Sequence, residues 1–180
     1  MKTDLEGRQL VESEEGLRLK AYPDPATGGE PWTIGYGHTS AAGVPKVVPG
    51  MVITAAQADQ ILAADLARFE SAVARAVTVS MSQHEFDACV DLCFNIGPAN
   101  FATSSVVRLL NAGDRAGAAM AFAMWTKAAG KVLPGLVARR KREATLFVTP
   151  DARPVAPAPV PSLLASLAGG LRALMPGGGA

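Results

Sequence analysis

The chain has 180 residues, of which 49% are apolar, so it can bury the core of one domain and still have residues left for a tail. Lys and Arg number 17 against 16 Asp and Glu, so the molecule lacks the strong positive field that would attract nucleic acid. The first residues, MKTDLEGRQLVESEEG, contain acids and no apolar run, which predicts neither a cleavable signal nor an N-terminal anchor.

Hydrophobic period, caps and turn residues predict a mainly helical chain with a small hairpin sheet near its N-terminus. The expected elements are a helix over 3–15, strands over 17–22 and 32–39, and helices over 53–77, 82–97, 103–110, 114–128 and 136–147. Thr54 and Gln57 form a capping box at the start of the helix over 53–77, which is long enough to connect two lobes.

The predicted strand over 32–39 carries glycines at alternate positions. In this strand Thr33, Gly35 and Gly37 are expected on one face and His38 on the other. Bare glycines weaken a strand, but they allow another group to approach its backbone closely. A bound ligand and a packed segment of the protein are the two interpretations of this face.

Cys89 and Cys93 are four residues apart in the predicted helix over 82–97. Adjacent turns of one helix hold two cysteines in poor geometry for a disulfide, so we expect reduced thiols in the core. Adding His84 does not give enough convincing ligands for a metal ion. The sequence therefore predicts no metal site.

The folded domain is predicted to span residues 1–149. Residues 150–161 are rich in Pro and Ala, which is typical of an extended linker. In the tail over 162–180 several leucines fall at helical spacing, namely Leu163, Leu164, Leu167, Leu171 and Leu174. The tail is too short to cross a membrane. Docking on the domain, contact with a membrane surface and disorder are all consistent with its sequence.

The acids near residue 15 suit a hydrolase that uses two carboxyl groups. A glycosidase needs one carboxyl group that donates a proton and one ionised group that directs water or attacks. Glu15 ends the first predicted helix, where the negative end of the helix dipole disfavours a second negative charge and so favours an acid. Asp24 lies in the following turn, and Thr33 could hold a water molecule. The pattern alone does not choose among Glu12, Glu14 and Glu15.

Three segments of the chain resemble the phage-type lysozymes of glycoside hydrolase family 24, in particular their lambdoid branch. They are EEGLRLKAYPDPATGGEPWTIGYGHT, SQHEFDACVDLCFNIGPANFATSSVVRLLNAGD and WTKAAGKVLPGLVARRKREATLF. The resemblance covers about residues 5–148 and leaves out the tail. It implies an α+β, lysozyme-like fold in which a small β-hairpin lobe and a larger helical lobe flank a cleft.

The resemblance also implies roles for single residues. Glu15 matches the general acid, Asp24 the carboxylate that places or activates water, and Thr33 the threonine that completes the triad. Eight residues separate Asp24 from Thr33, more than is usual in the family, so we expect the segment ATGGEP to bulge outward. His38 matches a histidine with a structural, hydrogen-bonding role.

Substrate contacts are implied less directly. Phe94 and Asn95 match a loop that lines the cleft in relatives, and Gly37 lies on the glycine-rich face near the acids. Asn95 could equally cap the end of its helix.

The function implied is that of an endolysin, a muramidase that hydrolyses the β-1,4 bond between N-acetylmuramic acid and N-acetylglucosamine. The implied partner is a peptidoglycan glycan strand, bound by a monomer without cofactor or metal. The alternatives are a lytic transglycosylase and a noncatalytic protein that binds the wall or disturbs membranes. Without a signal, the protein is expected in the host bacterial cytoplasm until a membrane lesion releases it to the cell wall.

The basic segment over 139–142 contains no aromatic residue, which argues against nucleic-acid binding. A solvated helix face is the simplest interpretation. Weak contact of this helix or of the tail with the outer membrane or the anionic cell wall is an intermediate hypothesis.

Overall fold

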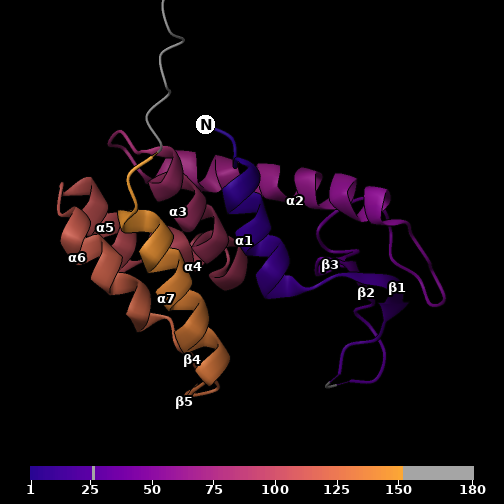
Figure 1. Cartoon of the computed structure of the whole chain (residues 1–180). Coiled ribbons are helices and arrows are strands. Elements are labelled where there is room, and N and C mark those ends of the chain that lie inside the picture. Colours follow the sequence, from indigo (N-terminus) through magenta and orange to yellow (C-terminus); the bar gives the residue numbers. More distant parts are fainter. Residues whose placement is uncertain (26, 152–180) are drawn as a thin grey trace, which may run out of the picture.

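The structure is a computed structural model that describes residues 1–25 and 27–151. It has two lobes joined by one long helix (Figure 1). Apart from residues 150 and 151, the predicted linker over 150–161 and the tail over 162–180 lie outside the described residues. No helix in the described part is long and apolar enough to cross a membrane.

The helices and strands follow one another in the order that the sequence predicts, with additional short elements. They are α1 (Leu5–Glu15), β1 (Arg18–Tyr22), β2 (Thr33–Gly35), β3 (His38–Thr39), α2 (Ala55–Ala76), α3 (Gln83–Ile96), α4 (Pro98–Ala102), α5 (Ser105–Asn111), α6 (Arg115–Ala121), the 3-10 turn η1 (Phe122–Met124), β4 (Lys127–Ala128), β5 (Lys131–Val132) and α7 (Pro134–Val148).

The first lobe is a three-stranded antiparallel sheet in the order β1-β2-β3, packed against the start of α2. Its small core consists of buried apolar side chains from the strands, the following loop and α2, namely Ala21, Ile34, Val47, Ile53 and Ala58. The capping box predicted at Thr54 is confirmed, because its side chain accepts from the amide of Gln57 and the Gln57 side chain accepts from the amide of Thr54.

The prediction of one strand over 32–39 was wrong. The chain turns at Tyr36 between β2 and β3, and Gly35 and Gly37 have φ values of 65° and 86°, which are costly for residues with a side chain. Gly37 therefore does not share a strand face with Thr33. His38 pairs with Ile34 and Thr39 pairs with Thr33, so His38 still lies on the face opposite Thr33.

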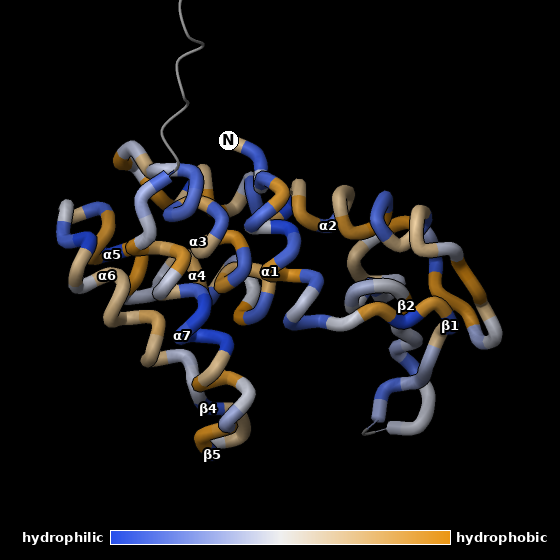
Figure 2. The backbone as a smooth tube through the Cα atoms, viewed as in Figure 1, coloured by the Kyte–Doolittle hydropathy of each residue, from blue (hydrophilic) through white to orange (hydrophobic). Residues whose placement is uncertain are grey.

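The second lobe is built around α3, which packs against α1, α2, α4 and α7 (Figure 1). Every residue of α3 from His84 to Cys93 is buried. Both cysteines are buried and free, which confirms the expected thiols, and burial raises the pKa of Cys93 to about 12. Apolar segments of the helices alternate with polar ones, as one buried face and one exposed face per helix require (Figure 2).

Two helix predictions in the second lobe need correction. The helix expected over 114–128 ends at Ala121 and gives way to η1 and to the β4–β5 hairpin, where Ala129 and Gly130 adopt positive φ. The segment between the helices expected over 82–97 and 103–110 contains the additional helix α4, started by Pro98. Pro fits the first position of a helix because its missing N–H has no partner there.

The position of α1 depends on a close contact with α3. Asp4 caps α1 by accepting from the amides of Glu6 and Gly7. A Cβ atom on Gly7 would lie 2.4 Å from Cγ of Asp87, so only glycine lets the two helices approach this closely. At its other end α1 stops at Glu15, and Gly16 turns the chain toward β1 with a φ of 68°.

Candidate active site

Glu15 is held at the junction of the two lobes. Its Oε1 accepts a 2.7 Å hydrogen bond from Nη1 of Arg139 on α7. Its Oε2 lies 3.5 Å from the point where a Cβ atom of Gly37 would be. Glu15 thus lies between the last helix of one lobe and the β2–β3 turn of the other, while 22% of its side chain remains exposed.

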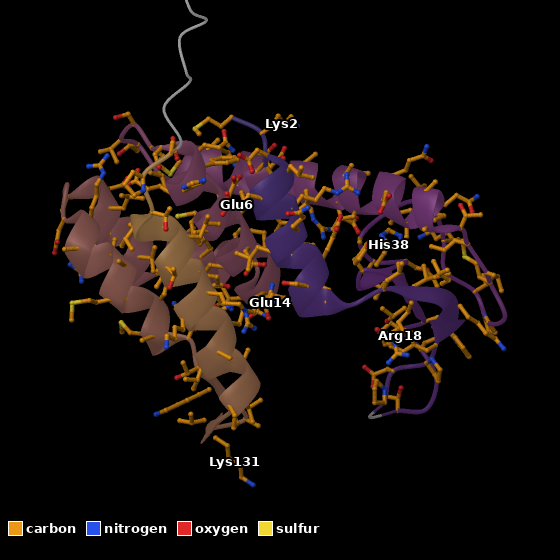
Figure 3. All side chains as sticks on the ribbon, viewed as in Figure 1. Lys2, Glu6, Glu14, Arg18, His38 and Lys131 are labelled. Atoms are coloured by element: carbon orange, nitrogen blue, oxygen red, sulfur yellow. The ribbon has the colours of Figure 1, made fainter. Side chains whose placement is uncertain are left out.

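Each of the three acids that the sequence left open is paired with an arginine. Glu12 accepts from Arg8 at 2.8 Å within α1. Glu14 accepts two bonds from Arg142, at 2.5 and 2.9 Å, and Figure 3 shows it at the end of α1 beside α7. Of the three, Glu15 lines a cavity of about 740 Å³ that runs along β1.

Arg139 belongs to a buried cluster of charged residues. Its Nε and Nη2 donate to the carboxylate of Asp91 on α3 at 3.2 and 2.8 Å. Glu143 lies 3.4 Å from Arg139 and also accepts from Arg140. Burial alone would lower the pKa of Arg139, but the carboxylates of Asp91 and Glu15 outweigh it and raise that pKa. The guanidinium of Arg139 is therefore always charged, and its hydrogen bonds to Asp91 and Glu15 fix its orientation.

This cluster corrects the prediction that residues 139–142 form a solvated face. Arg139 and Arg140 are only 5% and 2% exposed, whereas Lys141 and Arg142 face solvent. Burial, followed by the neighbouring carboxyl group of Asp91, raises the pKa of Glu143 well above its usual range. Among the described residues, Nε and Nη1 of Arg140 and Oε2 of Glu143 have no hydrogen-bond partner.

Asp24 lies in a turn that is closed by its own hydrogen bonds. The amide of Asp24 donates to Gly29 at 3.0 Å, and its carbonyl accepts from Gly28 at 2.8 Å. Its Oδ1 accepts from the amide of Thr27 at 3.1 Å, and the Thr27 hydroxyl donates to Glu30. These bonds give the long segment between Asp24 and Thr33 a defined shape.

Thr33 begins β2 and is half-buried. It pairs with Tyr22, two residues before Asp24, and with Thr39 on β3. The ladder between β1 and β2 has an irregularity, because Arg18 pairs with Gly35 while Tyr22 pairs with Thr33. Thr33 and the start of the Asp24 turn therefore lie at the same end of the β1–β2 pair.

His38 has the structural role that was expected. Its Nδ1 lies 2.8 Å from Oδ2 of Asp65 on α2, and its Nε2 lies 2.9 Å from the carbonyl of Pro45 (Figure 3). Contacts from both ring nitrogens hold the imidazole in one orientation between α2 and the loop that contains Pro45. His38 ties the sheet and the following loop to the long helix.

The predicted substrate contacts Gly37 and Phe94 line a different pocket from the β1 cavity. Gly37 and Phe94 line one pocket of about 260 Å³, together with residues of α2. Asn95 is exposed on the last turn of α3, and Gly97, not Asn95, provides the C-cap of that helix. No group of three or more potential metal ligands occurs within residues 1–25 and 27–151.

Sequence reasoning missed Asp91, Arg139 and Glu143 as part of the site. Two signals could have found them. Asp91 is a charged residue inside an otherwise apolar helical segment, and Arg139 and Glu143 are four residues apart on one helix. Charged side chains are seldom buried unless they are paired, so Asp91 predicts a cationic partner elsewhere in the chain.

Known proteins are similar in sequence to most of this chain. A family model described as phage lysozyme matches residues 12–143. The endolysin of Bacillus phage PZA is 44% identical over 141 residues, which are 78% of this chain and 53% of that endolysin. The endolysin of Salmonella phage P22 is 42% identical over 149 residues, which are 83% of this chain and 99% of that protein. The chain spans about half the length of its Bacillus phage relatives.

Solved structures confirm the lysozyme-like α+β fold. The muramidase domain of SpmX from Asticaccaulis excentricus aligns with a TM-score of 0.74 and 40% identity, over 83% of this chain and 99% of that one. A mutant of P22 lysozyme also aligns with a TM-score of 0.74, at 42% identity and with the same coverage.

Proposed function

The chain belongs to the phage lysozyme family, and we propose from that membership that it is an endolysin. Its reaction is hydrolysis of the β-1,4 bond between N-acetylmuramic acid and N-acetylglucosamine in peptidoglycan. The observation that carries the proposal is the placement of Glu15 at the junction of the lobes, fixed by Arg139 and exposed to the cavity along β1.

In the proposed reaction Glu15 donates a proton to the glycosidic oxygen as the bond breaks. Asp24 orients or activates the attacking water, and Thr33, at the same end of the sheet, helps to hold that water through its hydroxyl. When Glu15 carries the transferable proton, Asp91 still provides Arg139 with a buried counter-charge. The two hydrogen bonds from Arg139 to Asp91 thus keep the guanidinium in place throughout the reaction.

The remaining residues are proposed to bind the glycan strand. Phe94 offers an aromatic face beside Gly37, whose missing side chain leaves the pocket open. Asn95, exposed next to Phe94, offers an amide to a sugar hydroxyl or acetamido group. The protein acts as a monomer, and it waits in the host cytoplasm until a membrane lesion gives it access to the wall.

The test compares Glu15→Gln with Glu14→Gln. Both variants neutralise an arginine-paired acid of α1, but only Glu15 is proposed to donate the proton. We expect Glu15→Gln to lower the rate of peptidoglycan cleavage about 10²–10⁴-fold and Glu14→Gln to keep most of it. A Glu15→Gln protein that clears permeabilised Gram-negative cells at the native rate would contradict the enzymatic proposal.

The products separate hydrolysis from transglycosylation. Asp24→Asn should remove most activity, because a hydrolase needs the group that directs water. Mass spectrometry of the fragments should find reducing ends. If anhydro-muramic ends accumulate and Asp24→Asn stays active, the protein is a lytic transglycosylase.

A further inference from the structure

Two cations of β1 line the same cavity as the proposed acid. Arg18 and Lys20 are two residues apart on the strand, and both line the 740 Å³ cavity that contains Glu15. Both are exposed, and Figure 3 shows Arg18 on the sheet lobe. Alternation along a strand places side chains two residues apart on one face. The cavity therefore has a local pair of positive charges beside a carboxylate.

These two cations lack the partners that other cations near the site have. Within the described ranges 1–25 and 27–151, neither Arg18 nor Lys20 has a side-chain hydrogen bond or ion pair. By contrast, Arg139 and Arg142 are each bonded to an acid of α1. A cation left unpaired in a cavity keeps its full capacity to bind an anionic group of a ligand.

The backbone beneath Arg18 and Lys20 is held on both edges. Arg18 pairs with Gly35 of β2, and Lys20 forms a bridge with Val52 on the other side. The neighbouring residues add two backbone hydrogen bonds of 2.9 Å, from Ala21 to Met51 and from Ile53 to Leu19. The two charged side chains thus project from a fixed strand rather than from a loose loop.

The proposed substrate offers anionic groups of one kind near the scissile bond. The N-acetylated sugars of the glycan are uncharged, whereas the peptides attached to the muramic acid lactyl groups carry carboxylates. A guanidinium binds a carboxylate through two parallel hydrogen bonds, and an ammonium binds it as a point charge. Cations that line the cavity of Glu15 are therefore suited to the peptides next to the bond that is cleaved.

We propose that Arg18 and Lys20 bind carboxylates of the peptidoglycan peptides and so make the enzyme prefer peptide-bearing glycan over bare glycan. This inference rests on the proposed function, since it names the part of the substrate that the Glu15 cavity recognises. The contacts form in the ground state as well as in the transition state, so their loss raises KM and leaves kcat largely unchanged.

The experiment uses two substrates and two double variants in the full chain. Arg18→Gln/Lys20→Gln removes the proposed contacts. Arg75→Gln/Arg108→Gln removes two exposed cations of the helical lobe, with the same change in net charge. Each protein is assayed on soluble peptide-bearing glycan fragments and on the same fragments after enzymatic removal of the peptides, in low salt and in high salt.

We expect the β1 double variant to have a KM on peptide-bearing fragments roughly three- to tenfold above the native value, and an unchanged KM on stripped fragments. The difference should shrink in high salt, because these charges are exposed to solvent. The helical-lobe control should match the native protein on both substrates. Equal losses on both substrates, no loss, or an equal loss in the control would overturn the inference.

A binding measurement separates this inference from the proposed function. In Glu15→Gln protein, which cannot turn substrate over, calorimetry gives the Kd of a peptide-bearing fragment with and without the two β1 substitutions. We expect those substitutions to weaken binding roughly three- to tenfold. An unchanged Kd overturns the inference even if the enzyme cleaves peptidoglycan, whereas native protein that binds the fragment but cleaves neither substrate contradicts only the proposed function.

Discussion

Replacing Asp87 with Asn should stabilise the protein at pH 8 and have little effect at pH 4. Asp87 lies on α3 with no exposed surface, and only one of its oxygens is satisfied, by a 3.0 Å hydrogen bond from Nε2 of Gln83. Burial, and then the charge of Asp4, raise the pKa of Asp87 from its usual 3.8 to about 7. The folded protein therefore retains a proton that the unfolded chain has already released.

The raised pKa of Asp87 determines how the unfolding free energy changes with pH. Between pH 3.8 and about 7 the folded state binds more protons than the unfolded state, so stability falls as pH rises through this window. About three pKa units correspond to roughly 4 kcal/mol once pH exceeds 7, and solvent relaxation reduces this to about 2–4 kcal/mol. Asn is neutral at every pH, so it avoids the free-energy cost of ionising a buried carboxyl group. Its amide also supplies a donor beside Asp4.

The assay is urea unfolding followed by far-UV circular dichroism at pH 4 and pH 8, for the native protein, Asp87→Asn and Glu30→Gln. Glu30 is exposed on the turn over 23–32, so its replacement controls for the loss of one negative charge. We expect Asp87→Asn to have a higher unfolding free energy than the native protein at pH 8 and a similar one at pH 4. A stability change that is equal at the two pH values, or a loss at pH 8, would refute the reasoning.

Two further predictions concern contacts of α3. Asp91→Asn should cost about 3–5 kcal/mol of unfolding free energy because it removes the buried counter-charge of Arg139. Glu143→Gln should cost less at pH 7, because burial raises the pKa of Glu143 and so favours its uncharged form. Similar losses in the two variants would contradict a raised pKa for Glu143. Gly7→Ala should lower the unfolding free energy by about 1–3 kcal/mol, because its methyl group would overpack against Asp87. The control Gly135→Ala has open space around it, so thermal melts should show unchanged or slightly higher stability. Equal melting temperatures for the two alanine variants would contradict the close approach of α1 to α3.

Local signals were enough to predict most of the helices. Thr54 caps α2 as its capping box predicted, and Asp4 and Ser82 cap α1 and α3 in the same way, because a helix start depends on residues only three positions apart. The end of α6 was not predictable in the same way. Its apolar run continues past Ala121, where the chain passes into η1 and Phe122 packs in the core beside Phe147.

The same distinction between local signals and distant contacts applies to the candidate site. Glu15, Asp24 and Thr33 are close in sequence, so a local pattern and a family resemblance could identify them, and their catalytic roles remain predictions. The partner of Glu15 comes from 124 residues further along the chain. The run of basic residues over 139–142 gives no sign of which cations turn inward, since that depends on how α7 lies against α1 and α3.

The first and last described residues meet at the start of α3. The carboxylate of Asp151 accepts from the amides of Gln83 and His84, and the side chain of Gln83 donates to the carbonyl of Lys2. In Figure 1 this meeting point lies at the opposite pole from the β4–β5 hairpin and the turn after β1. A domain whose ends adjoin can be spliced into other chains or circularly permuted without stretching its core. A neighbouring domain joined at this meeting point would therefore leave the opposite pole uncovered.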